Sequence, residues 1–341
     1  MTQIAFDKMQ LRRYIAFAMA ALTCLCAVSC GDDDDDEYLS LTGSPEFEIP
    51  IYGVPGDTFT LSAKGVTCDD EDVVISYYWS AKPLQTTLDT ASVYTVTLTD
   101  TICTVTVSCT AYASGYYSSS TSHTIDILGL DKVNGSVKGK TFDSQKDFVY
   151  TDPRDGSEYW CTTIGGTQWF KENLAYKEMG TAVEDCPVTA PLFGMLYTWE
   201  EAQKACPEGW RVTSLQDWAD AAQVASGSAF DPKENFYSIA GVFMGQTYFN
   251  DTLMWEYWPD VKVTNSLGLD IMPIGYATVG ASKAEYSEMY NYATLWTSDE
   301  RDEDLGFYRY IYVEKPDMML GSADKKSFAA SVRCVRDIDG E

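Results

Sequence analysis

Few of the residue combinations that catalyse reactions are present in this chain. Its single histidine is His123, so a serine or cysteine nucleophile elsewhere has no imidazole base, and zinc or non-haem iron lacks its usual ligands. No phosphate-binding or dinucleotide-binding glycine motif occurs. Paired carboxylates for glycoside hydrolysis remain, but with 51 acidic residues such pairs arise by chance. We therefore expect a binding protein without a cofactor, with a carboxylate-dependent glycoside hydrolase as an alternative.

Cys30 has the sequence environment of a lipid-attachment site. Basic residues up to Arg13, followed by an apolar run over 14–28, are typical of a secretory signal peptide, here residues 1–29. The segment Ala27-Val28-Ser29-Cys30 resembles a bacterial lipobox, in which the cysteine thiol carries diacylglycerol after cleavage. Two acyl chains are sufficient for stable anchoring. We expect Cys30 to anchor the protein to outer-membrane lipid; the alternative is a soluble secreted protein.

An unbroken acidic run, residues 32–37, follows the cysteine. Its carboxylates repel one another and cannot fold, so residues 30–44 are expected to be a solvated tether. A cysteine followed directly by acidic residues also resembles the surface-export signal of Bacteroidetes lipoproteins, which predicts exposure on the cell surface. The formal charge of −27 argues against binding to nucleic acid.

Residues 45–130 are predicted to form a β-sandwich. Short runs rich in β-branched residues alternate with turn residues, and none has helical periodicity. Within the run 102–113, apolar and hydroxyl side chains alternate, which indicates a strand that covers a core with one face. The expected strands are 58–63, 73–79, 93–98, 102–113 and 121–128.

Three residues of this region follow the order of immunoglobulin-like sandwiches, in which a buried indole packs on a disulfide between the sheets. These are Cys68, Trp79 and Cys109, although Cys103 competes with Cys109 for Cys68. The segment 94–100 is also similar to PKD-like modules, which usually act as spacers. The acidic cluster 69–72 is expected to be a solvated loop, with a Ca²⁺ site as the alternative.

Two helices are predicted at the start of the region 131–341. The sequence Thr198-Trp199-Glu200-Glu201 is a capping box that opens a helix reaching Cys206. Ser214-Leu215-Gln216-Asp217 repeats the pattern before a second helix with apolar residues near helical spacing up to Ala225. After Gly227 the sequence indicates short strands and long loops.

The same region resembles the Fibrobacter succinogenes major paralogous domain over about residues 160–337. That family is similar to the C-type-lectin-like fold, so the fold class we expect is mainly β with α+β character: an immunoglobulin-like sandwich followed by a C-type-lectin-like domain with two helices and long loops. The segments that carry the resemblance are 163–174, 193–202, 205–212, 273–276, 295–300 and 331–337.

The resemblance implies a disulfide between the end of a helix and the last strand, Cys206 with Cys334. It leaves Cys161 with Cys186 as a second pair. The calcium-binding tripeptides of sugar-binding C-type lectins, Glu-Pro-Asn or Gln-Pro-Asp and Trp-Asn-Asp, are missing from this sequence. Calcium-dependent sugar binding is therefore not implied, and we expect no metal site.

Aromatic residues of the second region are candidates for a ligand surface. Rings in loops beside carboxylates form stacking platforms for sugars or hot spots for a protein partner, whereas the structural alternative is that they form the core. We expect an extracellular glycan or polysaccharide as the ligand; the alternative is a protein, bound by an adhesin or by a structural subunit of a surface assembly. The candidates are Trp255, Tyr257, Trp258, Tyr286, Tyr290, Tyr292 and Trp296.

Overall fold

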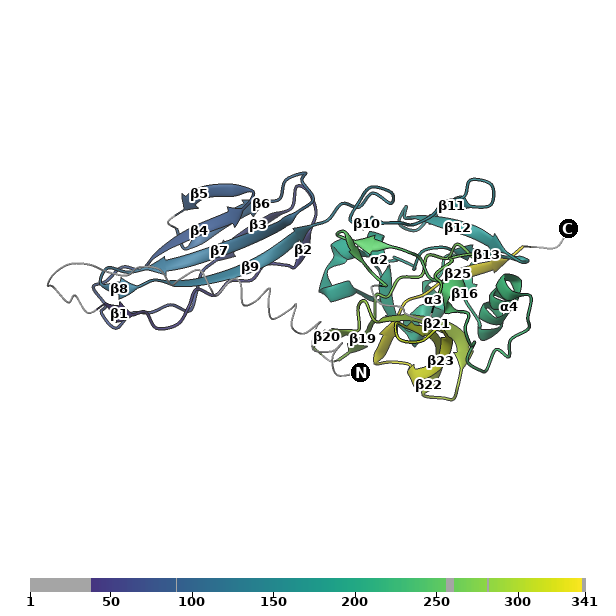
Figure 1. Ribbon diagram of the computed structural model, residues 1–341. Helices are drawn as coiled ribbons and strands as arrows, with labels where there is room; N and C mark the ends of the chain where they lie inside the picture. Colours follow the sequence, from purple (N-terminus) through teal and green to yellow (C-terminus); the bar gives the residue numbers. More distant parts are fainter. Residues whose placement is uncertain (1–37, 90, 256–260, 281, 339–341) are drawn as a thin grey trace. The chain divides into compact units, whose positions relative to one another are not determined.

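The computed structural model describes residues 38–89, 91–255, 261–280 and 282–338, which form two compact units (Figure 1). The first unit is built mainly from residues 57–98 and 104–125, and the second begins at Asp126 and also takes in 50–56 and 99–103. The expected signal peptide, Cys30 and the acidic run lie outside the described residues. None of the described helices has the length and apolar character that crossing a bilayer requires.

The first unit consists of β-strands, as predicted. All five expected strands are present within a few residues of their predicted ends. An additional strand, β5, was not predicted because its sequence, Gln-Thr-Thr-Leu-Asp, has no apolar alternation. Strands β9, β7, β4 and β5 lie in that order in one sheet, β3 pairs with β6, and β1 pairs with β8. Their bounds are β1 Leu39–Ser40, β3 Thr58–Ser62, β4 Ser76–Lys82, β5 Gln85–Asp89, β6 Val93–Thr97, β7 Thr104–Tyr112, β8 Tyr116–Tyr117 and β9 Ser119–Ile127.

The core of this unit is organised around Trp79 on β4. Its indole stacks on Tyr94 with ring centroids 5.5 Å apart, meets the edge of Phe47, and donates a hydrogen bond from Nε1 to the carbonyl of Ala91 at 3.0 Å. The apolar residues of β7, including Val105, are fully buried and its hydroxyl residues point outward. The predicted one-sided strand is therefore confirmed.

The disulfide expected in this unit is not formed, because Cys68, Cys103 and Cys109 are free thiols. Cys109 on β7 is the register partner of Trp79 on β4, so the indole and the thiol are neighbours within one sheet and no bridge joins two sheets. The Sγ of Cys68 instead lies 3.2 Å from the carbonyl oxygen of Asp70. Burial raises the pKa of Cys109 to about 12, which keeps its thiol protonated.

Both predicted helices of the second unit are confirmed: α3 (Trp199–Ala205) and α4 (Leu215–Ser226). Each begins with a complete capping box. The hydroxyl of Thr198 or Ser214 accepts a hydrogen bond from the backbone N–H three residues later, and the acidic side chain of that later residue accepts one from the backbone N–H of Thr198 or Ser214. The α4 helix ends at Gly227, in the left-handed conformation with φ 76°. Shorter helical turns are α2 Ala190–Phe193, η1 Val183–Asp185, η2 Pro187–Thr189 and η3 Ala240–Val242.

Four sheets complete the second unit, which makes the protein mainly β. The first sheet has the order β11 (Phe148–Thr151), β12 (Glu158–Ile164), β13 (Thr167–Phe170), β25 (Cys334–Asp337), β16 (Arg211–Val212). The second has the order β14 (Thr181–Ala182), β15 (Met195–Thr198), β24 (Phe328–Ala330), β19 (Tyr276–Val279), β20 (Ala284–Ser287). The third is β21 (Tyr292–Glu300), β22 (Leu305–Tyr312), β23 (Met318–Asp324), and the fourth is β10 (Val137–Lys138), β17 (Tyr248–Phe249), β18 (Thr252–Leu253). Strand β2 (Tyr52–Gly53) pairs with the last two residues of β9.

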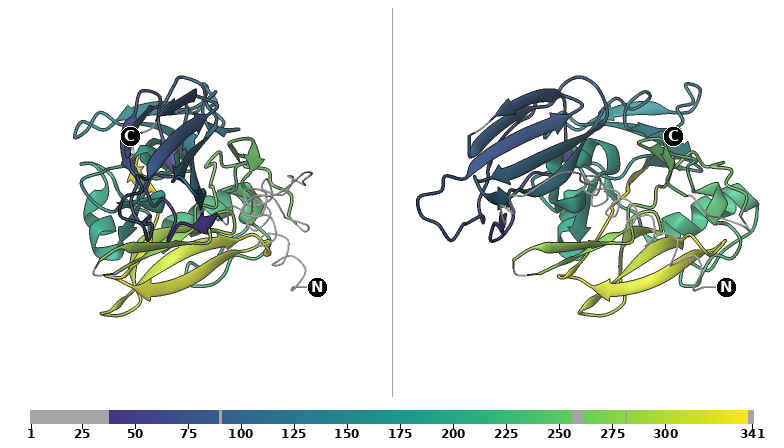
Figure 2. Two further views of the ribbon diagram at one scale, coloured as in Figure 1. Left: turned by 90° about the vertical axis from the view of Figure 1, so that its left-hand side faces the viewer. Right: turned by 60° about the vertical axis from the view of Figure 1, so that its left-hand side comes forward.

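The sheet β21-β22-β23 positions the candidate site, and Figure 2 shows it in yellow and yellow-green along one side of the second unit. One face packs on the core beneath α4, where Leu295 and Ile311 contact a cluster that includes Trp218. Side chains at the intervening positions point to the other face, because successive residues of a strand alternate. This other face carries Tyr292 and Tyr310.

The disulfide between Cys206 and Cys334 is confirmed, with the two Cα atoms 5.8 Å apart. It links the C-terminal cap of α3 to the first residue of β25. The second expected pair is wrong, because Cys161 and Cys186 are free thiols. Cys161 is packed among core residues on β12, and burial raises its pKa to about 12, whereas Cys186 lies between η1 and η2 beside the backbone of Tyr52.

We expect removal of this disulfide by Cys206→Ala with Cys334→Ala to lower the free energy of unfolding by about 4 kcal/mol, because the bridge closes a loop of 128 residues in the unfolded chain. Chemical denaturation of the double variant and the parent under oxidising conditions measures the difference. Cys161→Ala is a control for the loss of a buried thiol without a bridge. Peptide mapping that finds Cys206 free in the folded protein would contradict the assignment.

Candidate functional site

Two of the predicted ligand residues belong to the core. Trp255 is 4% exposed and donates from Nε1 to the carbonyl oxygen of Ile271 at 2.9 Å. Trp296 is fully buried, donates to the carbonyl oxygen of Tyr197 at 2.8 Å, and meets the rings of Tyr308 and Phe328 edge-on. Each indole N–H is satisfied inside the protein, so the prediction that these two tryptophans contact a ligand is wrong.

The other candidates have different environments. Tyr257 and Trp258 lie outside the described residues. Tyr286 and Tyr290 are half-buried and pack against the cluster around Phe193, and the hydroxyl of Tyr286 is 2.5 Å from that of Thr181. Tyr292 lies on the outward face of β21 and lines a surface hollow.

The register of β21 and β22 gathers tyrosines at this hollow. Tyr292 is opposite Tyr312, Thr294 is opposite Tyr310, and Trp296 is opposite Tyr308. These residues share one face, since directly opposed residues of antiparallel strands point the same way. The hollow has a volume of ≈ 440 Å³, and its lining residues are Tyr276, Glu288, Tyr292, Thr294, Tyr308, Tyr310 and Phe328.

Five of these side chains form a closed circuit of aromatic rings. We call the hollow that they line the tyrosine hollow. Neighbouring ring centroids are 5.8 Å apart for Tyr292 and Tyr310, and 6.4 Å for Tyr276 and Tyr292. The circuit continues through Phe328, 5.0 Å from Tyr276 and 5.2 Å from Tyr308, and closes at 5.7 Å between Tyr308 and Tyr310. All five are half-buried, so each ring keeps part of its surface open.

Gly321 on β23 allows Tyr308 to lie against the sheet. It is the register partner of Tyr308, and a Cβ added at this glycine would come within 2.4 Å of the phenol ring. On β24, Phe328 stacks on the same ring with an interplanar angle of 27°. The orientation of Tyr308 is therefore set by a glycine on one strand and an aromatic ring on another.

The tyrosine hollow contains neutral phenols and a single carboxylate. Burial raises the pKa of Tyr292 and Tyr310, and it raises the pKa of Tyr308 to about 12, so all three hydroxyls stay protonated. The side chain of Glu288 is oriented by Asn291, whose Nδ2 donates to Oε2 at 2.9 Å. No lysine or arginine is among the lining residues.

The sequence contained a signal for this arrangement that was missed. The residues of β22 read Leu-Gly-Phe-Tyr-Arg-Tyr-Ile-Tyr, with tyrosine at every second position. A period of two places these tyrosines on one face of a strand. Recognising the hollow also requires Tyr276 on β19 and Phe328 on β24, two strands that are distant from β22 in sequence or in sheet order.

A second hollow of ≈ 370 Å³ lies on the first unit, lined by Tyr78, Trp79, Ser80, Ser108, Thr110 and Tyr112. Its polar groups largely satisfy one another. Ser108 and Thr110 each share a hydrogen bond of 2.8 Å with a serine of β9, and Tyr78 packs edge-on against Tyr112. It therefore offers fewer free groups to a ligand than the tyrosine hollow.

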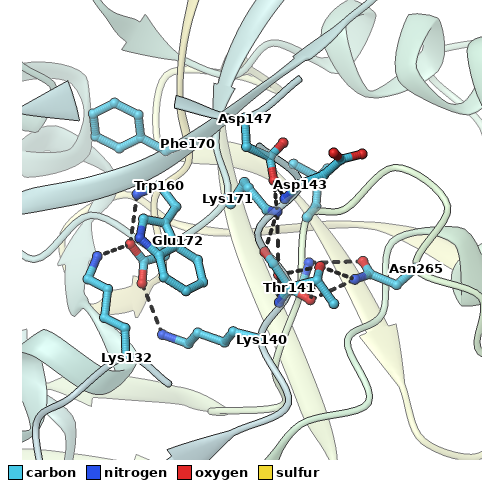
Figure 3. Close-up of polar contacts among 12 residues, drawn as sticks. Lys132, Lys140, Thr141, Asp143, Asp147, Trp160, Phe170, Lys171, Glu172 and Asn265 are labelled. Carbon is cyan, nitrogen blue, oxygen red and sulfur yellow. Dashed lines mark hydrogen bonds and ion pairs between the residues drawn. The ribbon is translucent and has the colours of Figure 1, made fainter. Parts of the chain in front are cut away.

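A buried ionic network surrounds the sequence Lys171-Glu172-Asn173, directly after β13 (Figure 3). The Nζ of Lys171 is 2.5 Å from Oδ2 of Asp147, and both side chains are almost fully buried. Glu172 lies between Lys132 and Lys140, with its Oε1 3.1 Å from Lys140 Nζ. The network is closed to solvent around Lys171, which indicates a structural role.

Opposing effects act on the pKa of Glu172. Burial alone would raise it, but the positive charges of Lys140 and Lys132 and a hydrogen bond from the backbone of Trp160 outweigh burial and hold the pKa at about 2. For Asp270 the balance is reversed, and burial raises the pKa despite the hydrogen bond from the backbone of Thr141. Glu172 is thus ionised because of its partners, whereas Asp270 is governed mainly by burial.

Asn173 extends the network to the C-terminal part of the unit. Its Oδ1 accepts from Nε of Arg333 at 2.8 Å, and this buried guanidinium also donates to the carbonyl oxygens of Phe170 and Leu269. Burial lowers the pKa of Arg333 to about 10, although Asp270 and Glu172 oppose the shift. Among the described residues, no group of three His, Cys, Asp or Glu side chains is placed to hold a metal ion.

Comparison with protein families gives one match. A model described as the Fibrobacter succinogenes major domain matches residues 162–336, a stretch that contains both the buried network's central sequence and the tyrosine hollow. Among curated proteins, none matches the chain.

We expect Glu172→Gln to lower the free energy of unfolding by about 3 kcal/mol near neutral pH, because it leaves Lys140 and Lys132 without a charged partner. The pKa of Glu172 is depressed in the folded state, so its contribution is complete above pH 4.5, its usual pKa, and is lost as pH falls towards 2. Urea denaturation across pH should therefore show the parent and the variant converging in acid. Exposed Glu208→Gln is the control, and a difference that does not depend on pH would refute the ion pair.

Proposed function

Because the chain belongs to the Fibrobacter succinogenes major domain family, we propose that it is a non-catalytic binding protein of the cell surface whose second unit binds an extracellular glycan in the tyrosine hollow. The observation that carries this proposal is the closed circuit of five half-buried rings around a hollow with one carboxylate. The alternative is that the second unit binds a protein, and the experiments below distinguish a protein ligand from a glycan.

The chemistry of the tyrosine hollow suits a sugar. Ring faces pack against the apolar C–H faces of a pyranose, while phenolic hydroxyls and a carboxylate form hydrogen bonds with sugar hydroxyls. A volume of ≈ 440 Å³ lies within the range of about 300 to 1,000 Å³ typical of small-molecule sites. Half-buried rings in fixed orientations also lose little conformational freedom on binding.

The finer fold assignment is part of the same proposal. We infer that the first unit is an immunoglobulin- or PKD-like spacer, supported by its antiparallel strands around a buried tryptophan. We infer a C-type-lectin-like fold for the second unit, supported by the disulfide between the end of α3 and β25. The proposed site does not depend on calcium, because its lining contains one carboxylate.

The cellular location rests on the sequence. A signal peptide ending in a lipobox, with Cys30 followed after Gly31 by acidic residues, supports a diacyl anchor in the outer membrane and exposure on the surface. Residues 38–44, which were expected to belong to the tether, instead lie in the first unit, where β1 pairs with β8. The anchor would then hold the tyrosine hollow outside the cell.

We expect Tyr292→Ala with Tyr310→Ala to weaken glycan binding by at least about tenfold, because both rings line the hollow. A glycan array with and without EDTA, followed by calorimetry on the best ligand, measures the loss. Tyr237→Ala, which removes a tyrosine that is 68% exposed and outside the hollow, is the matched control. An array without any bound glycan, together with co-purifying polypeptides, would favour a protein partner instead.

Replacing the lipidated cysteine, Cys30→Ala, should release the folded protein from the membrane with its glycan affinity unchanged. The physical reason is that the acyl chains supply the membrane affinity and the hollow lies in a separate part of the chain. Membrane fractionation and detergent partitioning measure the release. Ser29→Thr, which retains the cysteine, serves as the control, and retention of the cysteine-free variant in the membrane would refute the anchor.

A further inference from the structure

We propose that the tyrosine hollow selects a cationic sugar, namely a polysaccharide whose hexosamine units carry unacetylated amino groups. The inference rests on the proposed function, since it specifies the glycan that the same hollow binds. Five aromatic rings, one carboxylate and no basic side chain line the hollow, and this combination attracts a positively charged group.

The ring geometry favours an ammonium group. A cation is attracted to an aromatic face when it lies within about 6 Å of the ring centroid. Neighbouring centroids in the circuit are separated by 5.0 to 6.4 Å, so a cation that enters is close to more than one ring. The attraction is the sum over those rings that turn a face towards the charge.

The second unit uses its own cations on other aromatic rings. Among the described residues, basic groups lie over six aromatic rings, including Arg154 over Tyr176 at 3.8 Å and Lys325 over Trp199 at 4.7 Å. On β22 itself, Arg309 lies 3.8 Å from the ring of Phe236, on the core-facing side of the strand. None of these cations covers a ring of the tyrosine hollow, whose faces are left for a cation from outside.

The charge around the hollow acts in the same direction. Glu288 lines it, and burial is the main reason that the pKa of Tyr292 is raised, with the negative charges of Glu288 and Glu314 adding to the effect. A ligand ammonium therefore meets a carboxylate as well as ring faces. The strongly acidic chain, with a formal charge of −27, further favours the approach of a polycation.

The size and polarity of the hollow favour an amino sugar over an isolated ammonium group. A volume of ≈ 440 Å³ takes more than an ammonium head, and the phenolic hydroxyls on its lining need hydrogen-bond partners that sugar hydroxyls supply. A pyranose with an amino substituent satisfies the rings, the hydroxyls and the carboxylate together. A lysine side chain of a protein would satisfy the rings and the carboxylate only.

The decisive experiment compares two oligosaccharides that differ only in charge. Calorimetry of the full chain with hexamers of glucosamine and of N-acetylglucosamine, at a pH where the free amine is protonated, should show at least about tenfold tighter binding of the glucosamine hexamer. Equal affinities would overturn the cationic selectivity and leave glycan binding standing. If neither hexamer and none of the arrayed glycans binds, the proposed function is overturned. If a lysine-rich polypeptide binds and no sugar does, the proposal that the cationic ligand is a sugar is overturned.

Two matched pairs of variants assign the selectivity to the hollow. Glu288→Gln should weaken the glucosamine hexamer by about tenfold and leave the N-acetylglucosamine hexamer unchanged, whereas Glu285→Gln on the exposed part of β20 should affect neither. Tyr310→Phe keeps the ring and should retain the affinity within about threefold, whereas Tyr310→Leu should lose it. Equal effects of Phe and Leu would exclude an interaction with the ring face, and melting temperatures check that each variant is folded.

Discussion

The buried ion pairs of Lys171 and Glu172 are the constraint on which the second unit depends. A charge inside a protein is tolerated only with a partner, so every partner of these two residues has a fixed position. The partners come from residues 132–147 on one side, and through Asn173 the network reaches Arg333, next to the disulfide-bonded Cys334. Segments far apart in sequence are thereby held at one point, and the start of β25 is fixed by a disulfide at Cys334 and by hydrogen bonds of the preceding Arg333.

The tyrosine hollow follows from how the sheet β21-β22-β23 divides its two faces. One face is committed to the core, where Leu295 and Ile311 are buried and the guanidinium of Arg309 donates to the carbonyl oxygens of Pro232 and Glu234. Since this face is held in place by packing and hydrogen bonds, the register that exposes the opposite face is also fixed. The ring circuit is thus as rigid as the core behind it, which suits a site that binds without rearrangement.

Local signals in the sequence predicted local structure well. The capping boxes at Thr198 and Ser214 located both helices, and alternation within β7 identified the one-sided strand. The Cys206–Cys334 bridge was predicted correctly because the prediction came from a family pattern. The pairings proposed for Cys161 and Cys68 were wrong, because neither an oxidising compartment nor the order of the cysteines along the chain determines the distance between them. The burial of the tryptophans and of Lys171 and Glu172 depends on contacts between residues that are 16 to 99 positions apart in the chain, which no local pattern contains.

Five cysteines of the described residues are unpaired, and they have a consequence for how the disulfide forms. Two of them, Cys109 and Cys161, are buried, and burial raises the pKa of each to about 12, so both stay protonated at neutral pH. In the folded state these cysteines are chemically silent, and thiol exchange with the single bridge is suppressed. During synthesis the same residues are unprotected, and any of them can capture Cys206 or Cys334 in the wrong combination. Correct pairing of Cys206 with Cys334 therefore requires that the other cysteines do not form disulfides with either partner before they are buried.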